Sequence, residues 1–177
     1  SPGLSSDYAA VILRDRLLQA RIPAAVSFIR SHGRLADYLR SYEAVAEFQD
    51  RPPEVFAIGV LDAMVEEVGR LIAGIRKKFP SAFVVVGGPA SQTPEQFAAN
   101  VPDFDLLIKG DADEILPRAA TVFGGADRRR GLDAARREAL KELPGGLIFQ
   151  QWNRCLVHRL DLTNVPDRYH LPRPDKK

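Results

Sequence analysis

The 177-residue chain has very little cysteine, since Cys155 is its only one. A single thiol excludes an internal disulfide, and it excludes any metal or cluster site that needs two thiolates from this chain. The three histidines, His32, His158 and His170, are far apart, and none has a serine, cysteine or carboxylate neighbour at an informative spacing. No zinc motif, hydrolase elbow or nucleophile pair is present. The chain by itself therefore shows no recognisable catalytic groups.

An excess of charge of either sign is also missing, because 25 basic residues face 23 acidic ones. This balance gives no general argument for binding nucleic acid or a membrane surface. The run from Arg128 to Arg130 is the local exception, and the flanking Gly124, Gly125 and Gly131 favour a solvated loop. No apolar run approaches the ~20 residues of a membrane helix, and no signal peptide is evident. We therefore expect a cytoplasmic protein with no nucleic-acid or membrane partner.

Two kinds of apolar segment alternate along the first 125 residues. Helical spacing is found in residues 4–20, 35–49, 64–79, 93–100 and 113–123. Short apolar runs typical of buried strands occupy residues 24–29, 55–61, 83–88 and 104–110. The run at 55–61 has no polar alternation, which is expected of a strand covered on both faces. The pattern predicts an α/β fold with a doubly wound, mainly parallel sheet, Rossmann-like or flavodoxin-like, built by right-handed crossovers.

The composition changes after residue 125. Residues 124–131 suggest a mobile link, 132–143 a charged helix, and 147–160 two short strands that turn near Asn153. The proline-rich end is typical of an extended tail or linker. We therefore predict an α/β domain at 1–125 and, at 126–177, a helix, a small β-hairpin and a linker. Because the chain opens with Ser1 and not methionine, we also expect it to be processed or to be part of something longer.

The stretch FVVVGGPASQTPEQF, residues 83–97, predicts a strand, an open glycine loop and a capped helix. Gly87 and Gly88 permit unusual backbone angles and let a ligand approach the main chain. Thr93 suits an N-cap, Pro94 the first helical position, and Gln96 completes a potential capping box. A tight strand-to-helix turn without a ligand is the alternative. A P-loop is excluded, because no Gly-Lys-Ser/Thr follows.

A second loop, in IKGDADEILP, places Gly110, Asp111, Asp113 and Glu114 at the start of a helix. These carboxylates can simply complement the helix dipole. If the loop binds a ligand, hydroxyls and amide N–H groups are better partners than phosphate, which the carboxylates repel. Asp62 adds a carboxylate at the same edge, but a metal site of Asp62, Asp111 and Asp113 would lack a fixed ligand spacing. In parallel sheets such loops meet at the carboxyl ends of the strands, where ligands bind.

Residues 55–119 resemble the cobalamin-binding domain at the N-terminus of many radical S-adenosylmethionine enzymes. The segments that carry the resemblance are VFAIGVLD, KKFPSAFVVVGGPASQTPEQF and VPDFDLLIKGDADEILPRA, in the order that the family shows. LPGGLIF and DLTNVPDRYHLP are similar to the hairpin and proline-rich segment that join that domain to the barrel. The resemblance thus extends over roughly residues 4–172.

The resemblance implies a cobalamin site made by three loops. Its residues would be Gly59, Val60, Leu61 and Asp62 near the lower face of the ring, Gly87, Gly88, Pro89 and Ala90 along the nucleotide tail, and Gly110, Asp111, Ala112 and Asp113 beside that tail. Ala90 stands where the family often has histidine, and no Asp-x-His-x-x-Gly segment is present, so histidine ligation of cobalt is not implied. The family's first strand, expected before Pro2, and its CxxxCxxC motif are absent.

We therefore expect the cobalamin-binding domain of a cobalamin-dependent radical S-adenosylmethionine enzyme, a methyltransferase, that is non-catalytic by itself. Its partner would be the barrel of the same longer polypeptide, which would hold the iron-sulfur cluster and S-adenosylmethionine. One alternative is a degenerate scaffold or docking domain of such an enzyme that binds no cobalamin, which Ala90 and the missing first strand favour. A second alternative is a stand-alone sensory or partner-binding domain.

Overall fold

The computed structural model describes residues 3–28, 34–48, 50–61, 64–101, 103–110, 112–143, 147–152 and 155–159. The helices are α1 (Gly3–Gln19), α2 (Leu35–Glu43), α3 (Val65–Lys78), α4 (Pro94–Asn100), α5 (Ile115–Phe123) and α6 (Ala134–Lys141), with short 3₁₀ turns η1 (Ala46–Phe48), η3 (Pro89–Gln92) and η4 (Arg128–Arg130). The strands are β1 (Val55–Gly59), β2 (Phe83–Gly87), β3 (Leu106–Lys109), β4 (Leu147–Trp152) and β5 (Cys155–Arg159). Among these residues, no helix has both the length and the apolar character needed to cross a membrane.

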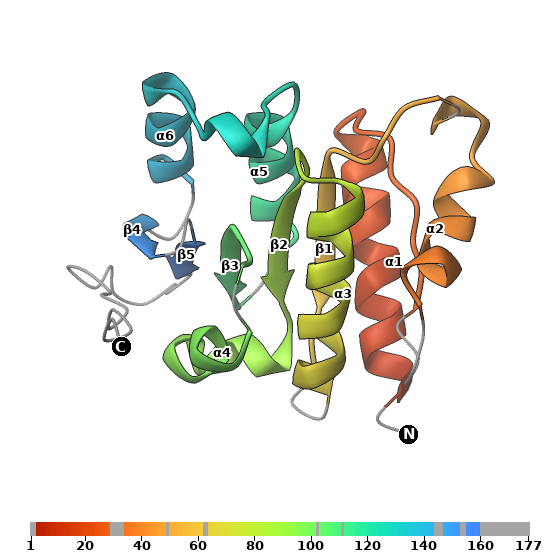
Figure 1. Ribbon diagram of the computed structural model, residues 1–177, viewed down its shortest axis with the longest axis horizontal. Helices are drawn as coiled ribbons and strands as arrows, with labels where there is room; N and C mark the ends of the chain where they lie inside the picture. Colours follow the sequence, from red (N-terminus) through yellow and green to blue (C-terminus); the bar gives the residue numbers. More distant parts are fainter. Residues whose placement is uncertain are drawn as a thin grey trace.

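The strands form one sheet in the order β1-β2-β3-β5-β4 (Figure 1). Strands β1, β2, β3 and β5 are parallel, and β4 pairs with β5 in the antiparallel direction. The predicted α/β fold with a mainly parallel, Rossmann-like or flavodoxin-like sheet is confirmed. The predicted hairpin is also present, as β4 and β5, and it extends the sheet beyond β3.

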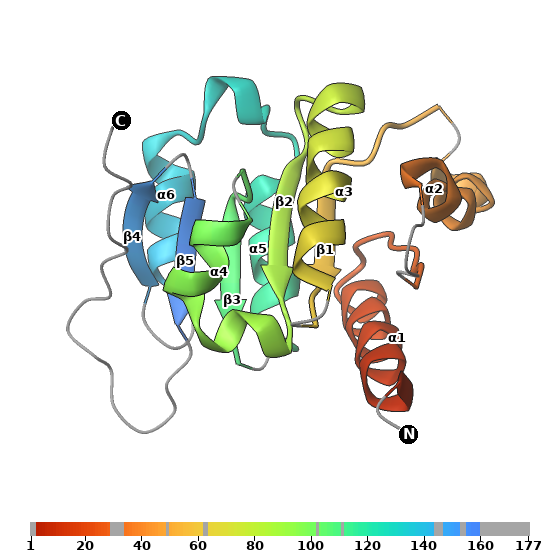
Figure 2. The ribbon, with the colours of Figure 1, turned by 60° about the horizontal axis from the view of Figure 1, so that its bottom comes forward.

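Both faces of the sheet are covered by helices (Figure 2). Along β2, Val84 and Val86 point into a core shared with α3 and α4, whereas Phe83 and Val85 point into a core shared with α5 and α6. All four side chains are at most 3% exposed. A parallel strand buried on both faces has a continuous apolar sequence, which is why the sequence FVVV predicts this strand.

The expected strand at 24–29 is wrong for residues 24–28, which have no strand structure, while Ile29 lies outside the described residues. Helix α1 packs with α5 on one face of the sheet, and α2 packs with α3 on the other. After α1 the chain contacts α2 before the described residues break off, since the hydroxyl of Ser27 donates to the carbonyl of Tyr38 at 2.7 Å. Coverage of β1 on both faces is also wrong, since Ala57 and Gly59 are exposed.

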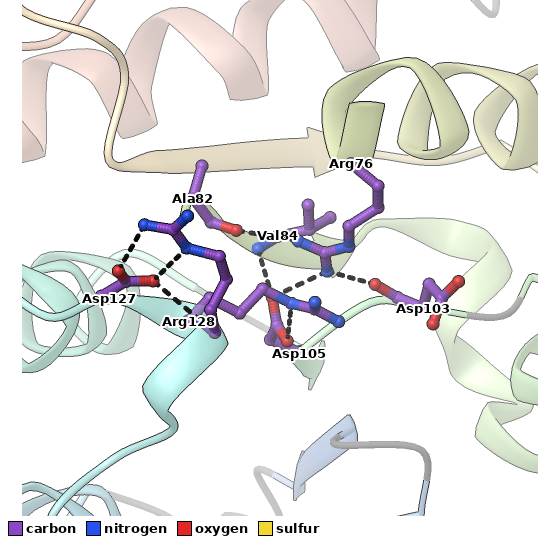
Figure 3. Close-up of polar contacts among 8 residues, drawn as sticks. Arg76, Ala82, Val84, Asp103, Asp105, Asp127 and Arg128 are labelled. Atoms are coloured by element: carbon purple, nitrogen blue, oxygen red, sulfur yellow. Dashed lines mark hydrogen bonds and ion pairs between the residues drawn. The ribbon is translucent and has the colours of Figure 1, made fainter. Parts of the chain in front are cut away.

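The amino ends of β2 and β3 are joined by a buried ionic cluster (Figure 3). Asp105, 3% exposed, accepts from Arg76 at 2.9 Å, from Arg128 at 2.8 Å and from the backbone N–H of Val84 at 2.8 Å. Arg76 also donates to the carbonyl of Ala82 at 2.8 Å. Burial lowers the pKa of Arg76, and the charge of Asp105 opposes this shift. The expected solvated loop at 128–130 is therefore wrong for Arg128, whose side chain is 10% exposed.

Candidate functional site

The three sequence-predicted loops leave the sheet at the same edge. Because β1, β2 and β3 are parallel, their last residues, Gly59, Gly87 and Lys109, all lie at the carboxyl edge. Of the predicted site residues, Asp62 and Asp111 lie outside the described part of the chain. The remaining ones are brought to this edge, and their surroundings decide what each can contribute.

Gly59 and Gly87 are neighbours across β1 and β2 in the register of the sheet. A Cβ added to Gly59 would meet nothing within 4 Å, and one added to Gly87 would meet only the carbonyl oxygen of Ile108, at 3.3 Å. The next residue of β1 on the same side is the exposed Ala57. We call Gly59 and Gly87 the glycine patch: a stretch of bare backbone at the carboxyl edge.

The glycine patch lies on the face of the sheet that α5 covers. Successive residues of a strand point to opposite faces, so Gly59 shares the face of Val55, and Gly87 shares the face of Phe83. Val55 and Phe83 both pack into the core with α5. A flat chemical group can therefore approach the backbone of β1 and β2 from this side with no intervening side chain at Gly59.

Gly88 has a structural role in the contact between the first two loops. Its φ is +92°, and an added Cβ would lie 2.8 Å from the nitrogen of Val60 and 3.0 Å from its oxygen. The same Val60 donates to the carbonyl of Gly87 at 2.8 Å and accepts from the N–H of Ala90 at 3.0 Å. Glycine is thus required at position 88 by the close contact between the first two loops, because the backbone of Val60 occupies the place that a side chain would take.

Several other predicted residues of the first two loops contribute backbone only. The side chains of Val60 and Ala90 are 1% and 4% exposed and belong to the core with α3 and α4. Pro89 begins η3, and Thr93 is the N-cap of α4, followed by Pro94 as predicted. The side chain of Thr93 makes no capping hydrogen bond, so the predicted capping box is wrong.

Sequence reasoning missed Ser91, which appeared to be one residue of a polar turn. It is fully buried, and its hydroxyl lies 2.6 Å from the carbonyl oxygen of Gly88 and 3.0 Å from that of Ile108. The hydroxyl therefore ties the second loop to the end of β3. A small polar residue shortly after an apolar strand and its glycines could have indicated a buried hydroxyl. The sequence does not show its hydrogen-bond partner Ile108, however, because that residue lies far along the chain.

The third loop is fixed by contacts to both α1 and α5. Gly110 has a φ of +94°, and Ala112 packs against the core on the α5 side. A carboxylate oxygen of Asp113 lies 3.8 Å from Nε of Arg16 in α1, and both side chains are partly exposed. Glu114 is the N-cap of α5, but its side chain makes no capping hydrogen bond. Acidic capping of this helix is therefore not seen at Glu114.

The described residues of the edge offer a binding surface more than a reactive centre. No group of three histidine, cysteine, aspartate or glutamate side chains within the described ranges could hold a metal ion. The glycine patch offers bare backbone, and the third loop adds the at least partly exposed carboxylates of Asp113 and Glu114. Such an edge suits a large polar ligand that is recognised along its length.

Comparison of the chain with protein-family models, with curated proteins and with solved structures finds no match. The fold class follows from the structure itself. The geometry of the carboxyl edge and the motifs of residues 55–119 are the features that bear on function.

Proposed function

We propose that this chain binds a cobalamin cofactor at the carboxyl edge of its sheet. We further propose that it is the non-catalytic domain of a longer cobalamin-dependent radical S-adenosylmethionine enzyme, a methyltransferase. The observation that supports this most is the glycine patch at Gly59 and Gly87. Cobalamin combines an amide-rimmed ring with a nucleotide tail, so it needs a broad site at the strand ends and bare backbone for the tail.

The residues present fit this cofactor, because Gly59 leaves open space beside the backbone that any side chain would take up. A Cβ there would have open space for at least 4 Å. Because Gly59 lies beside Gly87 in the register of the sheet, we place the tail against both glycines, and Gly59 no longer under the lower face of the ring as the sequence suggested. The loop from Gly110 to Asp113 would accept hydrogen bonds from amides and ribose hydroxyls. When bound, cobalamin supplies a cobalt centre that can carry a methyl group. This chain would hold and orient it for the barrel, which would bring the iron-sulfur cluster and S-adenosylmethionine.

The first experiment is a titration of the purified chain with hydroxocobalamin and methylcobalamin, read by gel filtration and visible absorbance. The test variant is Gly59→Leu, which places a side chain in the open space of the glycine patch. Gly69→Leu is the matched control, because Gly69, on α3, also has nothing within 4 Å of an added Cβ. We expect near-stoichiometric binding by the wild type and Gly69→Leu, and weakened binding by Gly59→Leu. Equal binding by all three would contradict this placement of the tail.

A scaffold that binds no cobalamin is the second candidate, and one observation favours it. The glycine at position 88 is already explained by its contact with Val60, so this part of the Gly-Gly-Pro motif needs no ligand. On this alternative the folded wild-type chain would elute without corrinoid in both titrations. Circular dichroism on the same sample would establish that the chain is folded.

A further inference from the structure

The third loop brings negative charge to the carboxyl edge of the sheet. The side chains of Asp113 and Glu114 are at least partly exposed there, and the proposed function places this loop beside the nucleotide tail. The phosphodiester of such a tail is an anion, and carboxylates close to it repel it. A site for the tail at this edge therefore needs a positive group near the third loop.

Helix α1 supplies a positive group at this loop, the guanidinium of Arg16. Its Nε lies 3.8 Å from Oδ2 of Asp113, and the side chains of Arg16 and Asp113 are 52% and 34% exposed. Nη1 of Arg16 also lies 3.4 Å from Oε1 of Gln19. A guanidinium has five N–H donors in a planar fork that matches the oxygens of a phosphate. A half-exposed guanidinium can therefore bind a phosphate while it stays close to Asp113.

Arg16 comes from a helix on the same face of the sheet as the glycine patch. Leu13 and Leu17 of α1 pack into the core with α5, the side to which the glycine patch also opens. Figures 1 and 2 both show α1 beside β1, whose last residue belongs to the glycine patch. Lys109, which ends β3, lies on the opposite face, because it follows by two positions Leu107 of the core with α3 and α4. Of these two cations, Arg16 is the one on the side of the tail.

We propose that Arg16 binds the phosphate of the nucleotide tail and that Asp113 positions its guanidinium, an inference that rests on the proposed function. The positive charge of Arg16 offsets the repulsion between the phosphate and the acidic third loop. The loop can then accept hydrogen bonds from the ribose hydroxyls with the phosphate close by. Because Arg16 belongs to α1 and not to one of the three loops, the loop motifs give no sign of it.

Absorbance titrations of the full chain with three corrinoids test the contact with the phosphate. Methylcobalamin has the phosphate and the nucleotide base, methylcobinamide phosphate has the phosphate without the base, and methylcobinamide has neither. The test variant is Arg16→Gln. Arg14→Gln is the matched control, because Arg14 lies on the same helix, has a side chain 36% exposed and pairs with Asp15. We expect Arg16→Gln to bind both phosphate-bearing corrinoids about tenfold more weakly than the wild type, the effect of losing one charge-assisted hydrogen bond.

Methylcobinamide should bind the wild type and Arg16→Gln alike, and Arg14→Gln should bind all three corrinoids as the wild type does. Arg16→Lys, which keeps the charge but not the planar fork, should recover part of the lost affinity. Added salt should weaken methylcobalamin binding more in the wild type than in Arg16→Gln.

Unchanged affinities in Arg16→Gln would overturn the inference. An equal loss for methylcobinamide, or an equal loss in Arg14→Gln, would overturn it too, because the effect would then not come from a contact between Arg16 and the phosphate. A wild-type chain that is folded by circular dichroism but binds none of the three corrinoids would instead overturn the proposed function itself.

Discussion

Asp105→Asn should remove a large part of the stability of this domain. Asp105 is 3% exposed and is the shared counter-ion of Arg76 and Arg128, whose side chains are 14% and 10% exposed. Asparagine keeps nearly the same shape and can still accept from the N–H of Val84. It removes the negative charge, however, and leaves two mostly buried guanidinium groups close together without a counter-ion.

The cost can be estimated from the kind of interaction that is lost. Removing one partner from a buried ion pair typically costs about 3–5 kcal/mol, because the remaining charge stays desolvated. A domain of this kind has roughly 5–15 kcal/mol of total stability. We therefore expect Asp105→Asn to lower the free energy of unfolding by about 3–5 kcal/mol, so that it unfolds at a much lower urea concentration than the wild type.

Urea unfolding followed by circular dichroism measures this loss, provided that the slope with denaturant is unchanged. Asp15→Asn is the matched control, since Asp15 is 53% exposed and pairs with the partly exposed Arg14 at 3.0 Å. That exposed pair should contribute less than about 1 kcal/mol. Similar small losses for both variants would refute the conclusion that the buried cluster holds the amino ends of β2 and β3 together.

Three further predictions concern individual residues. Gly88→Ala should destabilise the chain by at least about 2 kcal/mol in the same urea assay, because its φ is positive and an added Cβ would lie 2.8 Å from the nitrogen of Val60. Gly59→Ala should have little effect, because an added Cβ there meets nothing within 4 Å. Equal losses of stability for the two variants would contradict this difference in surroundings. Ser91→Ala should cost about 1–2 kcal/mol through the buried carbonyls of Gly88 and Ile108, and a neutral result would mean that another group satisfies them. Hydrogen bonds from the Arg129 side chain and backbone N–H lower the pKa of Asp127 to about 2. The stabilisation of the fold by the ionised Asp127 should therefore be complete above about pH 4 and lost as the pH falls through about 2. An NMR titration of the Asp127 carboxyl with a midpoint near 3.8 would contradict this.

The sequence predicted well the elements whose pattern is set by local burial. FVVV and DLLIK become central strands covered on both faces, so their apolar runs carry no ambiguity. Residues 24–28, AAVSF, are also mostly apolar, but forming a strand needs a partner edge as well. Propensity alone cannot say whether that partner is engaged.

The candidate site was predicted in position but not in detail. Parallel strands bring their carboxyl ends together, so the loops at Gly59, Gly87 and Gly110 could be placed from the strand pattern. Sequence could not reveal which glycine faces open space, because that depends on what lies opposite each glycine in the fold. The burial of Ser91 and the pairing of Arg128 with Asp105 depend on long-range contacts in the same way.

Whether the glycine patch binds the nucleotide tail can be tested by measuring the affinities of the wild type and Gly59→Leu for methylcobalamin and for methylcobinamide, which lacks that tail. The dissociation constants from absorbance titrations should show that the tail increases affinity for the wild type. This advantage should be absent in Gly59→Leu, while cobinamide should bind the two proteins alike. Equal affinities of the wild type for the two corrinoids would contradict the account.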